Sequence, residues 1–377
     1  MINALIGRFI WRVKLLSLVL LSVFLFAKCN SGVTEKDFVY IGTYTDGVSK
    51  GIYLSSFDNE SGKLETPKLA YKMENPSYLA VSISGDYLFA VSEKDEVIED
   101  LFSFRINHDT GELYFIDAVS TDGRGACYVE EIDSGLIGVA HYNSGDVVFI
   151  SHNNGIFDDG SMQQFAFEGG SINESRQESS HIHSVIADCE NKFVYVADLG
   201  RDKIEIFDIQ SDSVKHIRNV EIELGAGPRL VTFHPYKNQM AVINELNGTV
   251  IFYEKDSVGM FVTPFENVIL NEENNQPWSA DIKYSSSGDY LFVTERFDNK
   301  VYSFAVSDYE VNKIDVVTEG IDVPRSFAIS KEDKYLVVAS QEGQSVASYK
   351  LRPGGTFEKT EYIIEVDRPV CVIFKKK

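Results

Sequence analysis

The stretch GPRLVTFHPYKNQMAVINE, residues 227–245, contains the unit that decides the fold. A turn signal with proline opens it, and two apolar stretches follow, separated by a short polar segment. Such patterning predicts two antiparallel strands joined by a tight connection. The second strand of the unit recurs along the chain as FVYIGTY (38–44), YLFAVSE (87–93), LIGVAHY (136–142), FVYVADL (193–199), QMAVINE (239–245), YLFVTER (290–296) and YLVVASQ (335–341).

The first strand of the unit recurs as well. Its seven openings are Asn75-Pro76-Ser77, Gly125-Ala126-Cys127, His181-Ile182-His183, Gly227-Pro228-Arg229, Gln276-Pro277-Trp278, Val323-Pro324-Arg325 and Arg368-Pro369-Val370. A repeat of roughly 45–55 residues with strand content throughout is typical of a β-propeller. We therefore predict an all-β fold, a seven-bladed β-propeller.

The two ends of the chain complement each other. FVYIGTY at the N-terminal end lacks a preceding first strand, and PVCVIF (369–374) lacks everything after one. Pairing the C-terminal strand with the N-terminal strand completes one blade and removes the unpaired edges of an open array. We expect one propeller domain over residues 30–377.

Composition fits a single large module. The chain has 25 Phe and 19 Tyr, enough to fill the spaces between sheets, and no linker divides the repeats. A formal net charge of −22 argues against nucleic acid as a partner, because phosphate contacts require a basic surface. The same charge argues against binding to an anionic membrane surface.

Residues 1–29 are predicted to be a signal peptide. A positively charged start precedes a short apolar run over residues 15–27. Cys29 stands where a bacterial lipoprotein carries its lipid, although Lys28 departs from the usual small residue. We expect an exported protein in the periplasm or outer membrane, held to a membrane only through a lipid on Cys29. The alternative is ordinary cleavage, which gives a soluble periplasmic or secreted protein.

Aligning the repeats predicts two rings of side chains, because the inner strands of a propeller surround its axis. The residues after the proline positions are Ser77, Cys127, His183, Arg229, Trp278, Arg325 and Val370. The residues that end the second strands are Tyr44, Glu93, Tyr142, Leu199, Glu245, Arg296 and Gln341, and each follows a polar residue. The alternative is a solvated channel mouth in which ion pairs hold the blades together.

Several phrases of the chain resemble the seven-bladed lactonases, a family that includes propeller-type 6-phosphogluconolactonases and fungal carboxymuconate cyclases. The phrases are YIGTYTDGVSKGIY, NPSYLAVS, RQESSHIHSV, VYVADLGRDKIEIF, GPRLVTFHP and VINELNGTV. The resemblance covers residues 37–374. VADLG with an aspartate two residues on, and GPR followed by INEL, are the most specific phrases. The resemblance implies a small-molecule lactone as substrate.

The resemblance places acid/base and anion-binding groups at His183, Arg229, Glu245 and Arg296. Opening a lactone requires a base that activates water and positive charge where the carbonyl oxygen becomes an oxyanion. Histidine suits the base, and arginine suits an oxyanion, carboxylate or phosphate. Glu245 is expected to orient an arginine or the histidine, or to protonate the leaving alkoxide; the alternative is a plain salt bridge to Arg229.

Further residues are predicted to bind substrate. They are His181, His141, Tyr142, Asp198, Trp278 and Arg325. The polar stretch 155–180 is expected to be an irregular insertion that forms a lip over the mouth; the alternative is a disordered surface loop. Two residues depart from the family pattern: Leu230 follows GPR where histidine is common, and Ser180 replaces a usual proline.

Other reaction classes lack their motifs. The sequence has no Gly-rich phosphate loop, no zinc or EF-hand spacing and no nucleophile elbow, so we expect neither cofactor nor metal. The predicted function is hydrolysis of a sugar-acid lactone, similar to 6-phosphogluconolactone, by water activation. Export favours an unphosphorylated lactone. The alternative is a non-catalytic propeller, displayed on the envelope, that recognises carbohydrate or protein.

Overall fold

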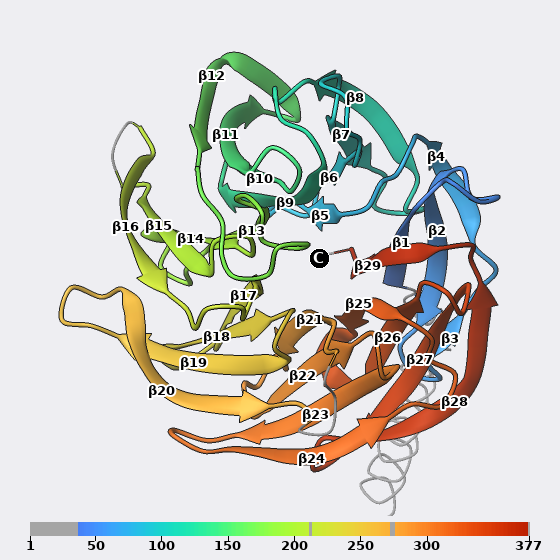
Figure 1. Ribbon diagram of the computed structural model, residues 1–377. Helices are drawn as coiled ribbons and strands as arrows, with labels where there is room; N and C mark the ends of the chain where they lie inside the picture. Colours follow the sequence, from blue (N-terminus) through green and yellow to red (C-terminus); the bar gives the residue numbers. More distant parts are fainter. Residues whose placement is uncertain (1–36, 211–212, 272–275, 376–377) are drawn as a thin grey trace, which may run out of the picture. The chain divides into compact units, whose positions relative to one another are not determined.

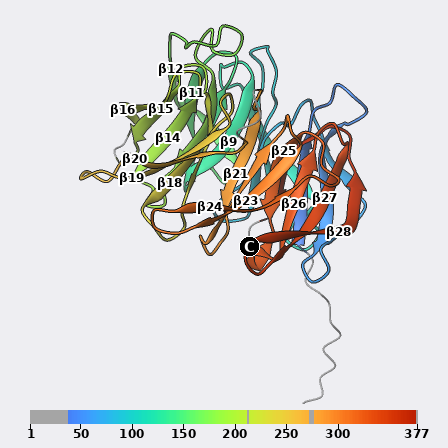
Figure 2. The same cartoon turned by 60° about the horizontal axis from the view of Figure 1, so that its bottom comes forward.

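The computed structural model describes residues 37–210, 213–271 and 276–375. Seven antiparallel sheets follow one another in a ring, so the predicted seven-bladed β-propeller is confirmed (Figure 1). In each sheet that is built from consecutive strands of the chain, the first strand lies nearest the centre of the ring (Figure 1). After a 60° turn, the blades stand as separate sheets side by side (Figure 2).

Six blades take four consecutive strands each. The first two consist of β5(Leu79–Val81), β6(Tyr87–Val91), β7(Leu101–Ile106) and β8(Leu113–Val119), and of β9(Ala126–Asp133), β10(Leu136–His141), β11(Asp146–Asn153) and β12(Ile156–Ala166). The next two consist of β13(Ile182–Ala187), β14(Phe193–Asp198), β15(Lys203–Asp208) and β16(Lys215–Glu221), and of β17(Pro228–Phe233), β18(Gln239–Asn244), β19(Thr249–Lys255) and β20(Phe261–Ile269). The last two consist of β21(Ser279–Tyr284), β22(Tyr290–Glu295), β23(Lys300–Val306) and β24(Val311–Val317), and of β25(Pro324–Ile329), the short 3-10 helix η1(Lys331–Asp333), β26(Tyr335–Ser340), β27(Ser345–Arg352) and β28(Thr356–Glu365).

The seventh blade joins the two ends of the propeller. Its innermost strand is β29(Pro369–Phe374), which pairs with β1(Asp37–Thr43), and the predicted closure is confirmed. The next strand, β2(Gly51–Asp58), pairs with two short pieces, β3(Lys63–Leu64) and β4(Lys68–Lys72). Pro67 lies between these pieces, and proline has no N–H to donate to a ladder.

The core lies between neighbouring blades. Each strand that sits third from the centre carries a fully buried aromatic residue. These residues are Phe57, Phe104, Phe149, Phe207, Phe252, Phe304 and Tyr349. Large rings at one radius fill the wedge-shaped gaps between sheets, which explains the abundance of Phe and Tyr.

The prediction of an irregular insertion over residues 155–180 is wrong for its first half. Residues 156–166 form β12, the outermost strand of its blade, which pairs with β11. An outermost strand keeps most of its side chains in water, so its composition resembles that of a loop. The irregular part is limited to residues 167–181, between β12 and β13.

The predicted signal peptide, with Cys29, lies outside the described residues. Across residues 37–210, 213–271 and 276–375, no helix has the length and apolar character that crossing a membrane requires.

Candidate active site

The first strand of six blades has a register shift close to its start. In β21 two residues, Ala280 and Asp281, face Thr294, and in the other five a single residue is left unpaired. In β13, for example, Ile182 pairs with Asp198 and Ser184 pairs with Ala197, which leaves His183 unpaired. Such a β-bulge bends the strand and breaks the alternation of side chains. The extra residues are Cys127, His183, Arg229, Arg325 and Val370, all members of the first predicted ring. The bulges therefore explain how residues at one position of the repeat, in different blades, direct their side chains toward the same region of the protein.

Glu245, directly after β18, contacts three arginines. Its Oε2 lies 3.0 Å from Arg229 Nε and 2.7 Å from Arg296 Nη2, and its Oε1 lies 2.5 Å from Arg176 Nη2. Burial alone would raise the pKa of this carboxyl, but the guanidinium groups of Arg296, Arg229 and Arg176 hold it well below its usual range. Glu245 is therefore ionised near neutral pH.

The two buried arginines are fixed by further contacts. Arg229 donates a hydrogen bond to the carbonyl oxygen of Ala280. Arg296 donates from Nε to the carbonyl oxygen of Trp278 at 3.1 Å, and its guanidinium lies 3.9 Å from the centroid of the Trp278 ring. Backbone acceptors and an aromatic face leave each guanidinium little freedom to move.

His183 lies beside these charges and is itself buried. Burial, and then the positive charge of Arg229, lower the pKa of the imidazole well below its usual range, and Glu245 opposes them only in part. The imidazole is therefore neutral near pH 7. Its Nδ1 has no hydrogen-bond partner in the part of the chain that the structure describes. A neutral, buried imidazole of this kind can accept a proton from a bound molecule.

Three more predicted residues join this group. Tyr142 stacks on His181, with ring centroids 4.3 Å apart, and meets His183 edge to face at 5.7 Å. Arg325 lies over the ring of Tyr44, 5.3 Å from its centroid, and its charge acts on the pKa of His183. We call His183, Arg229, Glu245, Arg296 and Arg325, with Arg176, the arginine cluster.

The structure does not bring His141 or Asp198 into the arginine cluster. His141 is fully buried between Asp100 Oδ2, 3.2 Å from Nε2, and Asp146 Oδ2, 3.0 Å from Nδ1. Burial alone would lower the pKa of His141, but the hydrogen bonds to the two carboxylates raise it to about 9. Asp198 accepts hydrogen bonds from Ser180 Oγ at 2.7 Å and from the backbone N–H of His181 at 3.0 Å. The side chains of His141 and Asp198 therefore make their contacts with residues outside the arginine cluster.

Three residues near the site were not among the predicted catalytic or substrate-binding residues. Arg176 belongs to the loop of residues 167–181, which has no equivalent in other repeats, so the alignment could not rank it. Tyr44 and Glu93 stand in the second predicted ring, and the Tyr44 hydroxyl donates to Glu93 at 3.1 Å. Their pairing with Arg325 depends on which blades are neighbours, and in the closed ring Tyr44 and Arg325 belong to adjacent blades.

The two departures from the family pattern have local explanations. Leu230 is buried in the hydrophobic core, whereas the neighbouring bulged residue, Arg229, contacts Glu245. Ser180 donates to Asp198 and, at 3.1 Å, to the carbonyl oxygen of Gly145. Neither substitution removes a polar group from the arginine cluster.

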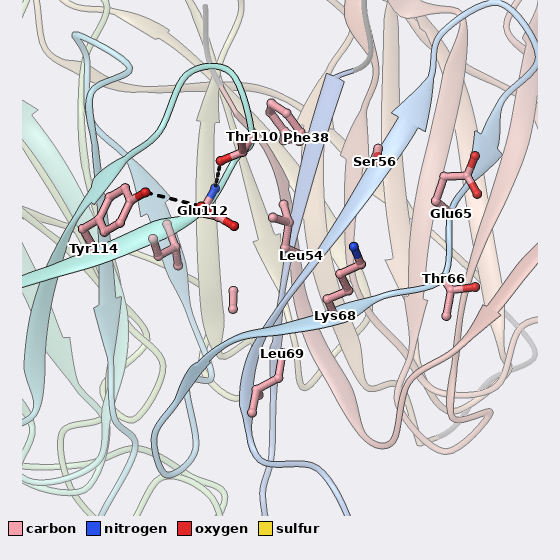
Figure 3. A pocket seen from close by; sticks show the side chains of 12 residues that line it. Phe38, Leu54, Ser56, Glu65, Thr66, Lys68, Leu69, Thr110, Glu112 and Tyr114 are labelled. Atoms are coloured by element: carbon pink, nitrogen blue, oxygen red, sulfur yellow. Dashed lines mark hydrogen bonds between the residues drawn. The ribbon is translucent and has the colours of Figure 1, made fainter.

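Over the described ranges, no three His, Cys, Asp or Glu side chains are grouped so as to hold a metal ion. A groove of about 790 Å³ lies on the outside of the propeller and is lined by parts of β1, β2, β4 and β8 (Figure 3). Its charged groups are Glu65, Lys68 and Glu112, and none of the ten predicted site residues lines it. The residues that line this groove include neither histidine nor arginine.

Comparison with known proteins shows the family of the chain. The family model described as Lactonase, 7-bladed beta-propeller matches residues 38–374. A 6-phosphogluconolactonase from Bacillus subtilis is 29% identical over 344 residues, 89% of this chain and 97% of the relative.

Two crystal structures of candidate 6-phosphogluconolactonases are similar. The one from Bacteroides fragilis is 27% identical with a TM-score of 0.86, over 92% of this chain and 99% of that chain. The one from Bacteroides uniformis is 30% identical with a TM-score of 0.84, over 90% of this chain and 99% of that chain. The protein described here belongs to the seven-bladed β-propeller lactonase family.

Proposed function

We propose that the protein hydrolyses the lactone of a sugar acid at the arginine cluster. The observation that carries this proposal is the neutral, buried His183, whose Nδ1 lacks a partner among the described residues, next to arginines fixed by Glu245. A base beside fixed positive charge is what opening a lactone by water requires. The 6-phosphogluconolactonase name of a relative supports the same class of substrate.

The proposed reaction begins when His183 takes a proton from a water molecule. The resulting hydroxide attacks the lactone carbonyl carbon, and the carbonyl oxygen becomes an oxyanion stabilised by the guanidinium of Arg229 or Arg296. The bond between that carbon and the ring oxygen then breaks. The protonated imidazole returns its proton to the leaving alkoxide, which yields the open hydroxy acid and restores neutral His183.

Glu245 has a positioning role in this mechanism. Its pKa lies too low for the carboxyl to carry a proton near neutral pH, so it cannot serve as the acid that protonates the alkoxide. Its two oxygens instead hold guanidinium groups from three segments of the chain together. Of the roles expected from the sequence, orienting arginines is the one that this geometry supports.

A pH-stat assay of the purified protein against a small lactone panel tests the proposal. The panel contains phosphorylated gluconolactone and unphosphorylated gluconolactone. We expect hydrolysis of at least one, and His183→Ala should lower kcat by a factor of about 10²–10⁴ because it removes the general base. His108→Gln, at an exposed histidine paired with Asp86, is the matched control and should leave kcat unchanged.

The two classes of function give different results in this assay. If wild-type protein leaves every lactone intact while still binding a sugar acid, the non-catalytic binding propeller replaces the enzyme. If His183→Ala hydrolyses lactone as fast as the wild type, lactone hydrolysis stands but His183 is not its base.

A further inference from the structure

The loop of residues 167–181 brings a third guanidinium to Glu245. Arg176 Nη2 lies 2.5 Å from Glu245 Oε1 and donates to the Tyr142 hydroxyl at 3.2 Å. The Arg176 side chain is 36% exposed, whereas those of Arg229 and Arg296 are 6% and 2% exposed. Arg176 is therefore the guanidinium of these three that a molecule arriving from solution meets first.

The loop rests on the segment 196–202, VADLGRD, which the sequence marks as a specific phrase. Asp198 accepts hydrogen bonds from the backbone N–H of His181 and the hydroxyl of Ser180. Gly200 faces Ser179, and a Cβ placed at Gly200 would lie 1.8 Å from the Ser179 carbonyl oxygen. Only glycine permits such an approach of the two backbones.

Asp202 ends this segment and ties the loop to the strand that carries Arg229. Its carboxylate accepts from Ser171 Oγ at 2.5 Å and from Gln177 Nε2 at 2.7 Å, both in the loop. It also accepts from the backbone N–H groups of Gly225 and Gly227, each at 2.7 Å. Gln177 is the neighbour of Arg176, and Gly227 lies two residues before Arg229. One buried carboxylate thus fixes the two segments that carry these arginines.

The charges around Glu245 leave an excess of positive charge. The guanidinium groups of Arg176, Arg229 and Arg296 share one carboxylate, that of Glu245, and His183 is neutral. Two other carboxylates act on these arginines, but Asp281 is paired with Lys283, and Glu178 is largely exposed and paired with His181. In a chain of net charge −22, this local excess favours an anionic ligand. A guanidinium binds the oxygens of a phosphate or carboxylate with its forked donors.

We propose that Arg176 binds an oxyanion of the substrate, a phosphate or a carboxylate remote from the lactone carbonyl, and that Asp202 is the positioning residue that holds Arg176 in place. This inference rests on the proposed lactone hydrolysis and adds the residue that selects among lactones. Among the described residues, the side-chain hydrogen bonds of Arg176, to Tyr142 and Glu245, both use Nη2, so a ligand can approach the other donors of the fork.

The first experiment compares three lactones of similar size: phosphorylated gluconolactone, a glucarolactone that carries a carboxylate, and neutral gluconolactone. Arg176→Gln should raise KM for an anionic lactone by about 10- to 100-fold, the worth of a charge-assisted hydrogen bond, with kcat changed less than threefold. KM for neutral gluconolactone should stay the same. If KM rises for phosphorylated gluconolactone, the oxyanion is a phosphate, and if KM rises for the glucarolactone, the oxyanion is a carboxylate. Arg218→Gln, on the outer strand β16, is the matched control.

The second experiment tests positioning by Asp202. Asp202→Asn presents an amide N–H₂ where four donors now meet a carboxylate, so the loop should lose its anchor. We expect the same selective rise in KM, and the double variant with Arg176→Gln should be no worse than either single variant. Asp208→Asn, in the same blade, is the control. Restored selectivity in Asp202→Glu would separate positioning from a loss of folding, which circular dichroism monitors for every variant.

Direct binding keeps this inference separate from catalysis. Calorimetry measures the affinity of wild type and Arg176→Gln for 6-phosphogluconate, glucarate and gluconate, the hydrolysed forms of the panel. If no lactone is hydrolysed but wild type binds 6-phosphogluconate or glucarate through Arg176 more tightly than gluconate, the proposed hydrolysis fails and the assignment of Arg176 stands. Equal losses for neutral and anionic lactones, additive effects of the two variants, or no binding of 6-phosphogluconate and glucarate by wild type would each overturn the assignment.

Discussion

Glu245 illustrates how one residue organises a basic site. Three guanidinium groups around one point would repel each other, and the carboxylate converts that repulsion into attraction. Because Glu245 and two of its partners are buried, water screens these interactions little. The site therefore depends on Glu245 for stability as well as for geometry.

Replacing Glu245 by glutamine should be strongly destabilising. The amide keeps the shape of the side chain but leaves buried guanidinium charge unpaired, which typically costs about 3–5 kcal/mol. Urea unfolding measures the loss. Glu319→Gln, which breaks an exposed pair with Lys359, is the control and should change stability by less than about 1 kcal/mol. Equal midpoints for Glu245→Gln and wild type would show that Glu245 does not compensate the arginines.

The pKa of His183 predicts the pH dependence of activity. A base must be deprotonated, and a pKa well below the usual 6.5 keeps His183 deprotonated as the medium becomes mildly acidic. The acid limb of kcat/KM should therefore lie clearly below pH 6.5. Arg325→Gln removes one of the positive charges that lower this pKa, so the limb should move to higher pH. A limb at 6.5 or above in wild type would contradict the assignment of His183.

At the scale of strands and loops, the repeat alignment predicted the ring of residues but not the device that forms it. In a regular strand, side chains alternate between the two faces of the sheet, and this alternation would decide the face for Arg229 and Arg325. The bulges at these two residues interrupt the alternation. A bulge depends on how two strands pair, which local sequence does not state. The loop that carries Arg176 was predicted as a lip, but no repeat offers a partner against which to align it.

The pair of carboxylates around His141 should stabilise the link between the blades of β7 and β11. The folded-state pKa of about 9 exceeds the unfolded value of 6.5, so this stabilisation is complete below pH 6.5 and is lost as the pH rises through 9. The contribution is about 3 kcal/mol. Unfolding free energies of wild type should therefore fall over this range relative to those of His141→Gln. Parallel curves for the two proteins would contradict a charged His141.

At the scale of the whole propeller, the sequence predicted blade number and closure because both follow from a count of repeats. Its main error concerned β12, since an exposed outer strand and a loop have the same polar composition. The His183, Arg229 and Arg296 side chains come from three successive blades, and Tyr44 approaches Arg325 only in the closed ring. Closure is thus a condition for the site and not only for stability.

Removing residues 368–377 should open the ring. The deletion takes away β29, whose Val370 and Val372 are almost completely buried, at roughly 1.5–3 kcal/mol for each side chain. It also exposes the backbone edge of β1 and the flanks of β25 and β5, which β29 covers. Together these losses approach the whole stability of a typical domain, about 5–15 kcal/mol. Thermal melting of the truncated chain should show no cooperative transition, or one at least 10 °C lower, a shift of the order expected from a loss of several kcal/mol.

A chain that ends at Lys375 keeps β29 whole and is the matched control, which should melt like the full chain. Adding the deleted segment as a separate peptide should restore part of the transition, because the peptide can pair with β1 as β29 does. Binding of a lactone or its acid should return together with the transition, since the arginine cluster needs neighbouring blades at fixed spacing. A truncated chain that melts and binds like the full chain would show that the pairing of β29 with β1 is dispensable for the ring.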